Sequence, residues 1–442
     1  MTDNTITEAD LAAFHGTVAR LRALPADDPV RLRAERVAES FAREGRRSRK
    51  KVRGDEQALA DAAVDAATAT GALDRREDAP LAAVDGASRE LARVRRCYVC
   101  KELYRHVDAF YHRLCPDCAL ENTARRTARA DLTGRRALLT GGRVKMGFQL
   151  ALMLLRDGAE LLVTTRFPRD ARRRFEEADG SAEWLGRLTI VGIDLRDPRQ
   201  VLGFTESLRE DGRPLDVLVN NAAQTVRRPP ESYAALVAGE GGVLPGNAVL
   251  APGFSPMLAL EHNGGALALA DLDEAGLLPD TAPVNSWSAR VGELDAAEVL
   301  ETHLVNALAP TLLCDRLLPL LLASPHERRY VVNVTAVEGR FAVRNKTSGH
   351  PHTNMAKAAL NMLTRTSGPE LAGQGVYMCS VDTGWITDEN PAPKKARLAR
   401  DGFRTPLDVV DGAARVYDPI VRGEAGSPVA GVFLKDYREA AW

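Results

Sequence analysis

Four of the six cysteines stand in two close pairs that could bind a metal ion. Two residues separate Cys97 from Cys100, fourteen residues follow, and two residues separate Cys115 from Cys118. A structural zinc ion takes four soft ligands in a tetrahedron, and two short CxxC turns supply them. The chain begins without a recognisable export signal, so we expect the cysteines to bind metal rather than form disulfides. The pattern therefore predicts a structural Zn²⁺ site.

The spacing is close to that of zinc ribbons. A redox dithiol would need one CxxC at the start of a helix that follows a strand, and it would leave the second pair unexplained. A closed four-cysteine site performs no chemistry itself, but metal binding can fold a segment too small to hold a core. We expect the module to join its neighbours on either side, with a docking surface for a partner as the alternative.

A glycine-rich turn forms the second candidate site. After the apolar run RALLT come Thr140 to Phe148, TGGRVKMGF, and then the helical pattern LALMLLRDG. A strand, a glycine turn and a helix in this order are typical of dinucleotide sites. Backbone N–H groups at the start of such a helix can hold a pyrophosphate. Gly141 and Gly147 are the glycines that this site would use.

The elements around this turn predict an α/β fold. Short apolar runs alternate with helical patterns from residue 135 onward, and they read RALLT, ELLVTTR, LTIVGID, LDVLVNN, YVVNVT and VYMCSVD. Buried runs separated by helices indicate a doubly wound parallel sheet of the Rossmann type. The region of about 225–294 interrupts this order and is too long for a simple loop. We expect an insertion with some helix near a ligand site, or else a surface elaboration without a chemical role.

Residues 133–442 resemble the short-chain dehydrogenase/reductase family. The family's TGxxxGxG turn matches Thr140 to Gly147, although Lys145 stands where the middle glycine belongs. The family's NNAG segment after the fourth strand matches Asn220-Asn221-Ala222-Ala223. The resemblance implies that Asp194 contacts the adenine, that Asn221 belongs to the cofactor site, and that Asn306 and Lys357 belong to the active site, where Lys357 also holds the nicotinamide ribose. The family's PG segment after the sixth strand matches Thr383-Gly384-Trp385. We therefore expect an oxidoreductase that binds a nicotinamide dinucleotide and a small-molecule substrate.

The choice of cofactor is predicted from charge. The family places an acidic residue at the end of the second strand to bind the NAD ribose, but here that strand ends in Thr165-Arg166. An arginine can pair with a 2′-phosphate in forked geometry, and Arg143 adds positive charge within the glycine turn. NADP(H) is therefore favoured over NAD(H). The alternative is that Arg166 is an ordinary surface arginine.

Two catalytic positions of the family are substituted in this chain. The tyrosine position, four residues before Lys357, is Thr353, and the serine position is Ala336. A threonine hydroxyl is far less acidic than a phenol, so Thr353 is a poor general acid, although it could orient a substrate or cap the following helix.

Another group must then supply the proton in an active enzyme. His352 is our first candidate because histidine titrates near neutrality; His350, Glu338 and Lys357 are the others. The histidines could instead only line the loop, and Glu338 could be a surface carboxylate. These substitutions leave two hypotheses open: an oxidoreductase with a non-standard proton donor, or a catalytically inactive NAD(P)-binding regulatory or interaction protein.

The chain has 442 residues, and we divide it into a helical region (1–95), the four-cysteine module (96–132) and the Rossmann-type domain (133–442). We expect the first helix to start near Thr7 and the second near Pro29. The basic run from Arg46 to Arg53 is expected to be a solvated helical face rather than a nucleic-acid contact.

The formal charge of −1 argues against a broad electrostatic attraction to nucleic acid or anionic membrane. Charged residues make up 27% and hydrophobic residues 45%, which excludes a fully disordered chain. The sequence contains no uninterrupted run of about 20 apolar residues, so we expect no membrane-spanning helix. We expect a cytoplasmic protein, and a homo-oligomer if the added regions leave the usual family interfaces open.

Overall fold

The computed structural model describes residues 5–84, 86, 88–255, 272–278, 281–343 and 346–442. The chain divides into two compact units. Residues 1–63 and 91–93 form the first, and residues 64–90 and 94–442 form the second. The second unit contains both the four cysteines and the α/β body, so the expected division at 95 and 132 does not follow these compact units and stays a prediction.

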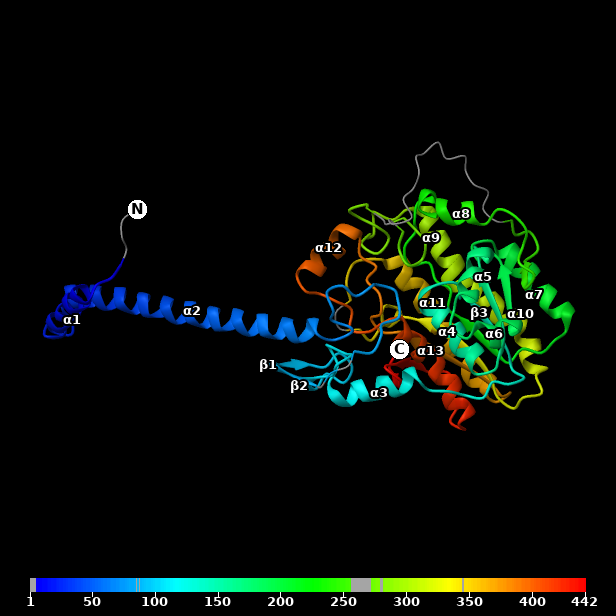
Figure 1. Ribbon diagram of the computed structural model, residues 1–442, viewed down its shortest axis with the longest axis horizontal. Coiled ribbons are helices and arrows are strands. Elements are labelled where there is room, and N and C mark those ends of the chain that lie inside the picture. The colour runs from blue at the N-terminus through cyan, green and yellow to red at the C-terminus, as the bar shows by residue number, and fades with distance from the viewer. Residues whose placement is uncertain (1–4, 85, 87, 256–271, 279–280, 344–345) are drawn as a thin grey trace. The chain divides into compact units, whose positions relative to one another are not determined.

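The first unit is built from helix α1 (Glu8–Arg22) and most of helix α2 (Pro29–Ala66), as Figure 1 shows. Thr7 caps α1 as expected, because its side chain accepts from the Asp10 N–H and Asp10 accepts from the Thr7 N–H. Neither helix contains a buried residue. The basic run from Arg46 to Arg53 lies within α2 and is exposed, which agrees with a solvated helical face.

The second unit contains a nine-stranded sheet in the order β11-β10-β9-β8-β6-β3-β4-β5-β7. All neighbours pair in parallel except β10 and β11, which are antiparallel. The six apolar runs form β3 (Arg136–Thr140), β4 (Glu160–Thr165), β5 (Leu188–Gly192), β6 (Val217–Asn220), β8 (Arg329–Thr335) and β9 (Val376–Asp382). The remaining strands of this sheet are β7 (Ala248–Leu250), β10 (Phe433–Lys435) and β11 (Arg438–Ala440). The predicted doubly wound α/β fold is therefore confirmed.

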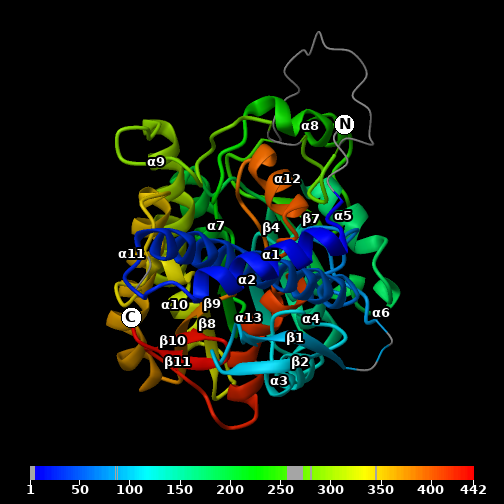
Figure 2. The ribbon, with the colours of Figure 1, turned by 90° about the vertical axis from the view of Figure 1, so that its left-hand side faces the viewer.

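Helices cover both faces of this sheet, which explains why β3, β6 and β8 are buried throughout. Helix α4 (Lys145–Arg156) packs against α13 (Val409–Glu424), and α7 (Pro198–Asp211) packs against α10 (Ala309–Leu322). Helix α11 (Pro351–Ala372) packs against β9 beside α10. In Figure 2, α10 and α11 lie on one side of β8 and β9, and α4 lies on the other.

The shorter helices connect or cover these elements. They are α3 (Pro116–Arg126), α5 (Pro168–Glu176), α6 (Ser181–Trp184), α8 (Ala234–Gly239), α9 (Ala296–His303) and α12 (Ala392–Arg400). Helix α9 continues into α10 through a π-helical turn, Leu304–Leu308. Short 3-10 turns occur at Leu185–Arg187, Pro230–Tyr233 and Val337–Gly339. A separate two-stranded antiparallel sheet, β1 (Arg89–Arg96) and β2 (Leu103–Val107), lies beside the cysteine pairs in the sequence.

The insertion contributes a strand that was not predicted from the sequence. Ala248 to Leu250 form β7, which pairs in parallel with β5 and extends the sheet at that edge. Three residues are too few to show an apolar run. The described part of the insertion also contains α8, in agreement with the expected helix, and residues 256–271 and 279–280 lie outside the described residues.

One continuous helical run in the described part of the chain, Ala296–Leu322, is long and apolar enough to cross a membrane by length and composition. No such span was expected from the sequence. Slightly more than half of the apolar window, 56%, is buried inside the protein, and Leu313, Leu317 and Leu321 pack in the sheet core. The apolar character of this run is thus accounted for by packing against the sheet.

Candidate cofactor and active site

The glycine turn between β3 and α4 forms one wall of a pocket of about 410 Å³ at the carboxyl ends of β3, β4 and β5. Gly141 has φ +72°, a conformation that favours glycine. A Cβ at Gly147 would lie 2.1 Å from the Gly141 carbonyl oxygen, so the turn can close only with glycine there. Ligands of open α/β sheets bind at this edge. The predicted turn residues Gly141, Arg143, Lys145 and Gly147 all line the pocket.

Lys145 adopts the backbone conformation of the glycine that it replaces, with φ +53°. Its ammonium lies 2.7 Å from an Asp78 carboxylate oxygen and 3.9 Å from Glu389. Burial alone would lower the pKa of Lys145, but Glu389 and Asp78 raise it above its ordinary value. Lys145 is therefore a cation that joins the glycine turn to two distant segments of the chain.

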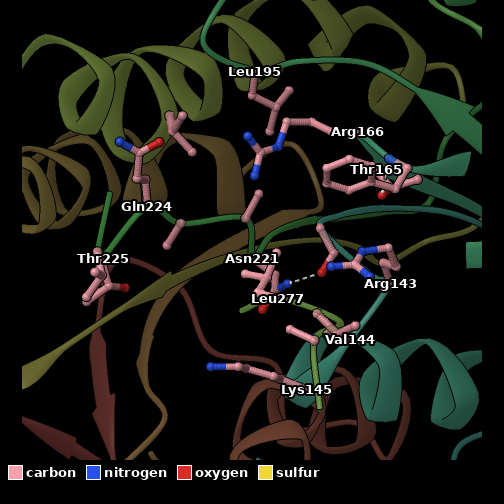
Figure 3. A pocket seen from close by; sticks show the side chains of 18 of the residues that line it. Arg143, Val144, Lys145, Thr165, Arg166, Leu195, Asn221, Gln224, Thr225 and Leu277 are labelled. Carbon is pink, nitrogen blue, oxygen red and sulfur yellow. Dashed lines mark hydrogen bonds between the residues drawn. The ribbon is translucent and has the colours of Figure 1, made fainter. Parts of the chain in front are cut away.

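Arg166, at the end of β4, enters the pocket from the opposite side to Lys145 (Figure 3). Its guanidinium lies 4.8 Å from the centre of the Tyr233 ring and 5.5 Å from that of Phe167. Among the described residues, no carboxylate forms an ion pair with Arg166. Tyr233 belongs to the insertion, so this region contributes to the pocket lining. The arginine is held by aromatic rings and is available to an anionic group.

Asp194 and Arg143 also line the pocket, but both are already paired. Arg196 donates to Asp194 at 2.6 Å; burial raises the pKa of Asp194, yet this hydrogen bond lowers it overall. The Arg143 guanidinium lies 2.5 Å from Asp170 and packs over the Phe167 ring at 5.2 Å. Arg143 was expected to add free charge for the cofactor. Its charge is instead neutralised by Asp170, from α5.

Two asparagines hold the pocket loops in place. The Asn221 amide donates to the carbonyl oxygens of Thr140 and Gly141, both at 2.9 Å, and so ties the end of β6 to the glycine turn. Asn306 lies in the π-helical turn and binds the main chain of Gln224 through both amide atoms, at 2.7 and 3.0 Å. Asn306 does not line the pocket. In this structure it positions the loop that does.

Lys357 lies on α11 and is buried beside the end of β8. Its Nζ donates to the Val334 carbonyl oxygen at 2.8 Å. Burial lowers the pKa of Lys357 to about 8, against the opposing charge of Glu338. A lysine with this pKa can change protonation near neutral pH, which suits a role in proton transfer. The pocket lining does not include Lys357.

Thr353 lies within the first turn of α11 and does not cap it, because the helix begins at Pro351. The capping role that the sequence left open is therefore excluded. The Thr353 hydroxyl is buried without a hydrogen-bond partner among the described residues. Such a group destabilises the fold unless something else binds it. Ala336 follows β8 and offers no hydroxyl.

His352 is paired with a carboxylate that was not singled out from the sequence. Its Nε2 lies 3.2 Å from Glu298, on α9, and its Nδ1 is buried without a partner among the described residues. Burial raises the pKa of Glu298, but the hydrogen bond with His352 lowers it overall. Figure 1 shows α9 near α11, two elements that are about fifty residues apart in sequence. No local pattern could have revealed the pair.

The neighbouring candidate His350 stacks on the Trp287 ring with centroids 3.8 Å apart, and its Nδ1 lies 2.8 Å from the Trp287 carbonyl oxygen. Burial lowers the pKa of His350. A second missed residue is Asp382, the last residue of β9. Its carboxylate accepts from the Val337 N–H at 3.1 Å, and burial raises its pKa to about 6. Its place directly before the Thr383-Gly384 segment was the available signal.

Gly384 lies beside the pocket rather than in its lining. It has φ +75°, and a Cβ there would lie 2.7 Å from Leu407 and 3.6 Å from the Tyr98 hydroxyl. The residues that follow it, Ile386 and Thr387, do line the pocket. Tyr98 stands between Cys97 and Cys100, so the cysteine module reaches the segment that borders the pocket.

The four cysteine sulfurs lie within 4.8 Å of one another, and those of Cys100 and Cys115 are 3.6 Å apart. Four sulfurs bound to one tetrahedral ion at about 2.3 Å stand about 3.8 Å from each other. The Cys115 N–H also donates to the Cys97 sulfur at 3.3 Å. The arrangement can therefore hold a metal ion, and among the described residues this is the one such cluster.

Comparison with known proteins agrees with the fold and the turn. Residues 135–235 match the family model described as short chain dehydrogenase. An uncharacterized protein of Acanthamoeba polyphaga mimivirus is 31% identical over 352 residues, which span 74% of this chain and 71% of that protein. C-signal of Myxococcus xanthus is 31% identical over 136 residues, 31% of this chain and 80% of that protein.

Gluconate 5-dehydrogenase of Gluconobacter oxydans is 35% identical over 106 residues, which span 23% of this chain and 39% of that enzyme. Among solved structures, a short chain dehydrogenase from Burkholderia cenocepacia in complex with NADP is 22% identical, with a TM-score of 0.46. It matches over 69% of this chain and 96% of that chain.

Proposed function

Because the chain belongs to the short-chain dehydrogenase/reductase family, a family of oxidoreductases, we propose that it is an NADP(H)-dependent oxidoreductase with a non-standard proton donor. The position of Arg166 is the observation that favours NADP(H) over NAD(H). Its guanidinium enters the pocket at the end of β4, packs on Tyr233 and has no carboxylate partner among the described residues. The position suits a 2′-phosphate, for which arginine provides paired donors.

The residues of the pocket fit a dinucleotide. Gly141 and Gly147 let the turn close, and the start of α4 directs N–H groups to the site where a pyrophosphate would bind. Asn221 holds this turn against β6, and Asp194, which lines the pocket, is the residue that we propose contacts the adenine. When bound, NADP(H) supplies or accepts a hydride. The protein must then bind the substrate, orient it and move one proton.

We propose that His352 supplies or accepts that proton, with Glu298 holding the imidazole in place. Lys357, with a pKa of about 8, assists transfer from its place beside β8. The unpartnered hydroxyl of Thr353 would accept or donate a hydrogen bond to a substrate oxygen. This division of roles takes the place of the family's tyrosine and serine. The substrate is a small organic molecule with a carbonyl or hydroxyl group.

We also propose that the four cysteines bind a structural Zn²⁺ ion. The number of cysteines and the short distances between their sulfurs support this assignment. A zinc ion with four protein ligands has no open coordination position for a water or substrate, so the site would be structural rather than catalytic.

Fluorescence titration with NADPH and NADH tests the cofactor assignment. We expect wild-type protein to bind NADPH at least tenfold more tightly than NADH. Arg166→Ala should lower NADPH affinity more than tenfold and NADH affinity less than twofold. Arg169→Ala, whose guanidinium bonds the Gly241 carbonyl oxygen instead, is the control. Equal affinity for both cofactors would overturn the NADP(H) preference, and binding of neither would overturn the site.

A second candidate function is a catalytically inactive nucleotide-binding protein with a regulatory or interaction role. Ala336 and Thr353 favour it, as does the absence of Lys357, His352 and Thr353 from the pocket lining. Turnover separates the two. An enzyme oxidises NADPH with an aldehyde or ketone from a broad panel, and Lys357→Ala abolishes this oxidation. Tight NADPH binding without turnover on any acceptor would favour the inactive protein.

A further inference from the structure

We propose that Tyr98 of the cysteine module is a positioning residue for the cofactor pocket, acting through the turn at residues 384–387. The inference rests on the proposed NADP(H) and zinc sites. It gives the metal module a function in cofactor binding, beyond that of joining two parts of the chain.

The first step is the contact between the module and the turn. The Tyr98 hydroxyl accepts a hydrogen bond from the Trp385 N–H at 2.9 Å. The Lys435 ammonium lies 5.6 Å from the centre of the Tyr98 ring and holds the side chain from the sheet side. Gly384, at φ +75°, allows the chain to turn against the tyrosine. The hydroxyl thus holds a main-chain amide that secondary structure leaves unpaired.

The second step leads from the turn to the pocket. Ile386 and Thr387 follow Trp385 directly, and both line the pocket together with Glu389. Ile386 is buried against Gly412, where a Cβ would lie 2.7 Å from its side chain. Glu389 lies 3.9 Å from Lys145 of the glycine turn. A shift at Trp385 therefore moves residues of the pocket lining that lie next to the glycine turn.

The third step connects Tyr98 to the cysteines. Tyr98 lies one residue after Cys97 and two before Cys100, so the turn that holds both sulfurs also sets the direction of its side chain. The Cys97 N–H bonds the Glu102 carbonyl oxygen and the Tyr98 N–H bonds the Arg113 carbonyl oxygen, both at 2.8 Å. An ion bound by all four sulfurs would restrain this turn further. Metal occupancy and cofactor affinity should then be coupled.

Tyr98→Phe tests the proposal in the full-length, zinc-loaded protein. The variant keeps the ring and removes the acceptor of the Trp385 N–H. We expect the NADPH dissociation constant to rise about fivefold, with zinc content and thermal midpoint unchanged. Amide exchange should become faster in residues 384–387. Tyr104→Phe is the matched control, because its hydroxyl bonds the His112 carbonyl oxygen within the module, and it should leave NADPH affinity unchanged.

Metal removal provides a second arm. Chelation should weaken NADPH binding by wild-type protein and speed exchange at residues 384–387, but it should add little in Tyr98→Phe, because that contact is already lost. Unchanged NADPH affinity in a zinc-loaded Tyr98→Phe protein overturns the proposal. So does chelation that weakens binding equally in both proteins. Failure of wild-type protein to bind NADPH would instead overturn the proposed function.

Discussion

The Lys145 ammonium lies 2.7 Å from the Asp78 carboxylate, and both residues have a left-handed backbone, with φ +53° and +63°. Lys145 stands in the glycine turn, and Asp78 precedes the cysteine module. Burial raises the pKa of Asp78 even though Lys145 opposes the shift. The pair therefore joins two strained positions, and its attraction offsets a backbone conformation that glycine would adopt freely.

Two variants of Lys145 separate strain from charge. Lys145→Met keeps the strained backbone and removes the ammonium, whereas Lys145→Gly removes both. We expect both variants to lower the free energy of unfolding, with Lys145→Gly the more stable by about 1 kcal/mol, because glycine adopts positive φ without a Cβ clash. Urea unfolding measures the difference. Equal stability of the two variants would show that the left-handed conformation carries no strain.

Asp382 should make stability depend on pH. Its pKa is about 6 in the folded protein, against the ordinary aspartate value of 3.8 that we take for the unfolded chain, so the folded state binds more protons between these values. Stability then falls as pH rises from about 4 to 6. Asp382→Asn keeps an acceptor for the Val337 N–H and removes the titrating charge.

The free energy of unfolding of this variant, relative to wild type, should increase by up to about 3 kcal/mol across that range and stay level above it. The other charged groups near position 382, Lys435, Asp436 and Glu338, are present in both proteins. Urea unfolding at a series of pH values measures the difference, with the exposed Asp401→Asn as control. A difference from wild type that is the same at pH 4 and pH 7 would contradict the prediction.

If Thr353 binds substrate, its replacement by valine should raise the stability of the protein and lower its activity. Thr353→Val removes an unpartnered buried hydroxyl, so the ligand-free protein should become more stable by about 1 kcal/mol. NADPH oxidation with a working acceptor should fall at least tenfold. Thr364→Val on the same helix is the control and should destabilise, because its hydroxyl bonds Asn333, Leu360 and Ser380. Undiminished turnover in Thr353→Val would remove Thr353 from the active site.

Glu298→Gln tests the proton-transfer pair. Gln keeps the shape of the side chain but removes the charge that faces His352, so turnover should fall about tenfold while NADPH affinity stays the same. The control is Glu293→Gln, whose carboxylate caps the Arg290 N–H away from His352. Steady-state kinetics with direct NADPH titration separates the two effects. Wild-type turnover in Glu298→Gln would point to another proton donor.

Local patterns in the sequence were sufficient to predict the six apolar strands, the glycine turn and the cysteine cluster. The composition of an apolar run such as Val376–Asp382 is enough to predict a buried strand. The spacing of the four cysteines along the chain is likewise enough to predict a metal cluster. The strand β7 could not be predicted, because three residues contain no period and its pairing depends on β5.

The tertiary structure decided which charges are free and which are paired. The sequence offered Arg166 as the 2′-phosphate partner and Arg143 as added positive charge, but in the structure Asp170 pairs with Arg143, whereas aromatic rings hold Arg166. Glu298 reaches His352 across 54 positions of sequence. A side chain's protonation and availability depend on its neighbours in space, because burial and nearby charge set the energy of its ionised form. The sequence by itself therefore determined the scaffold and where its sites lie, and the fold determined which residues in them can act.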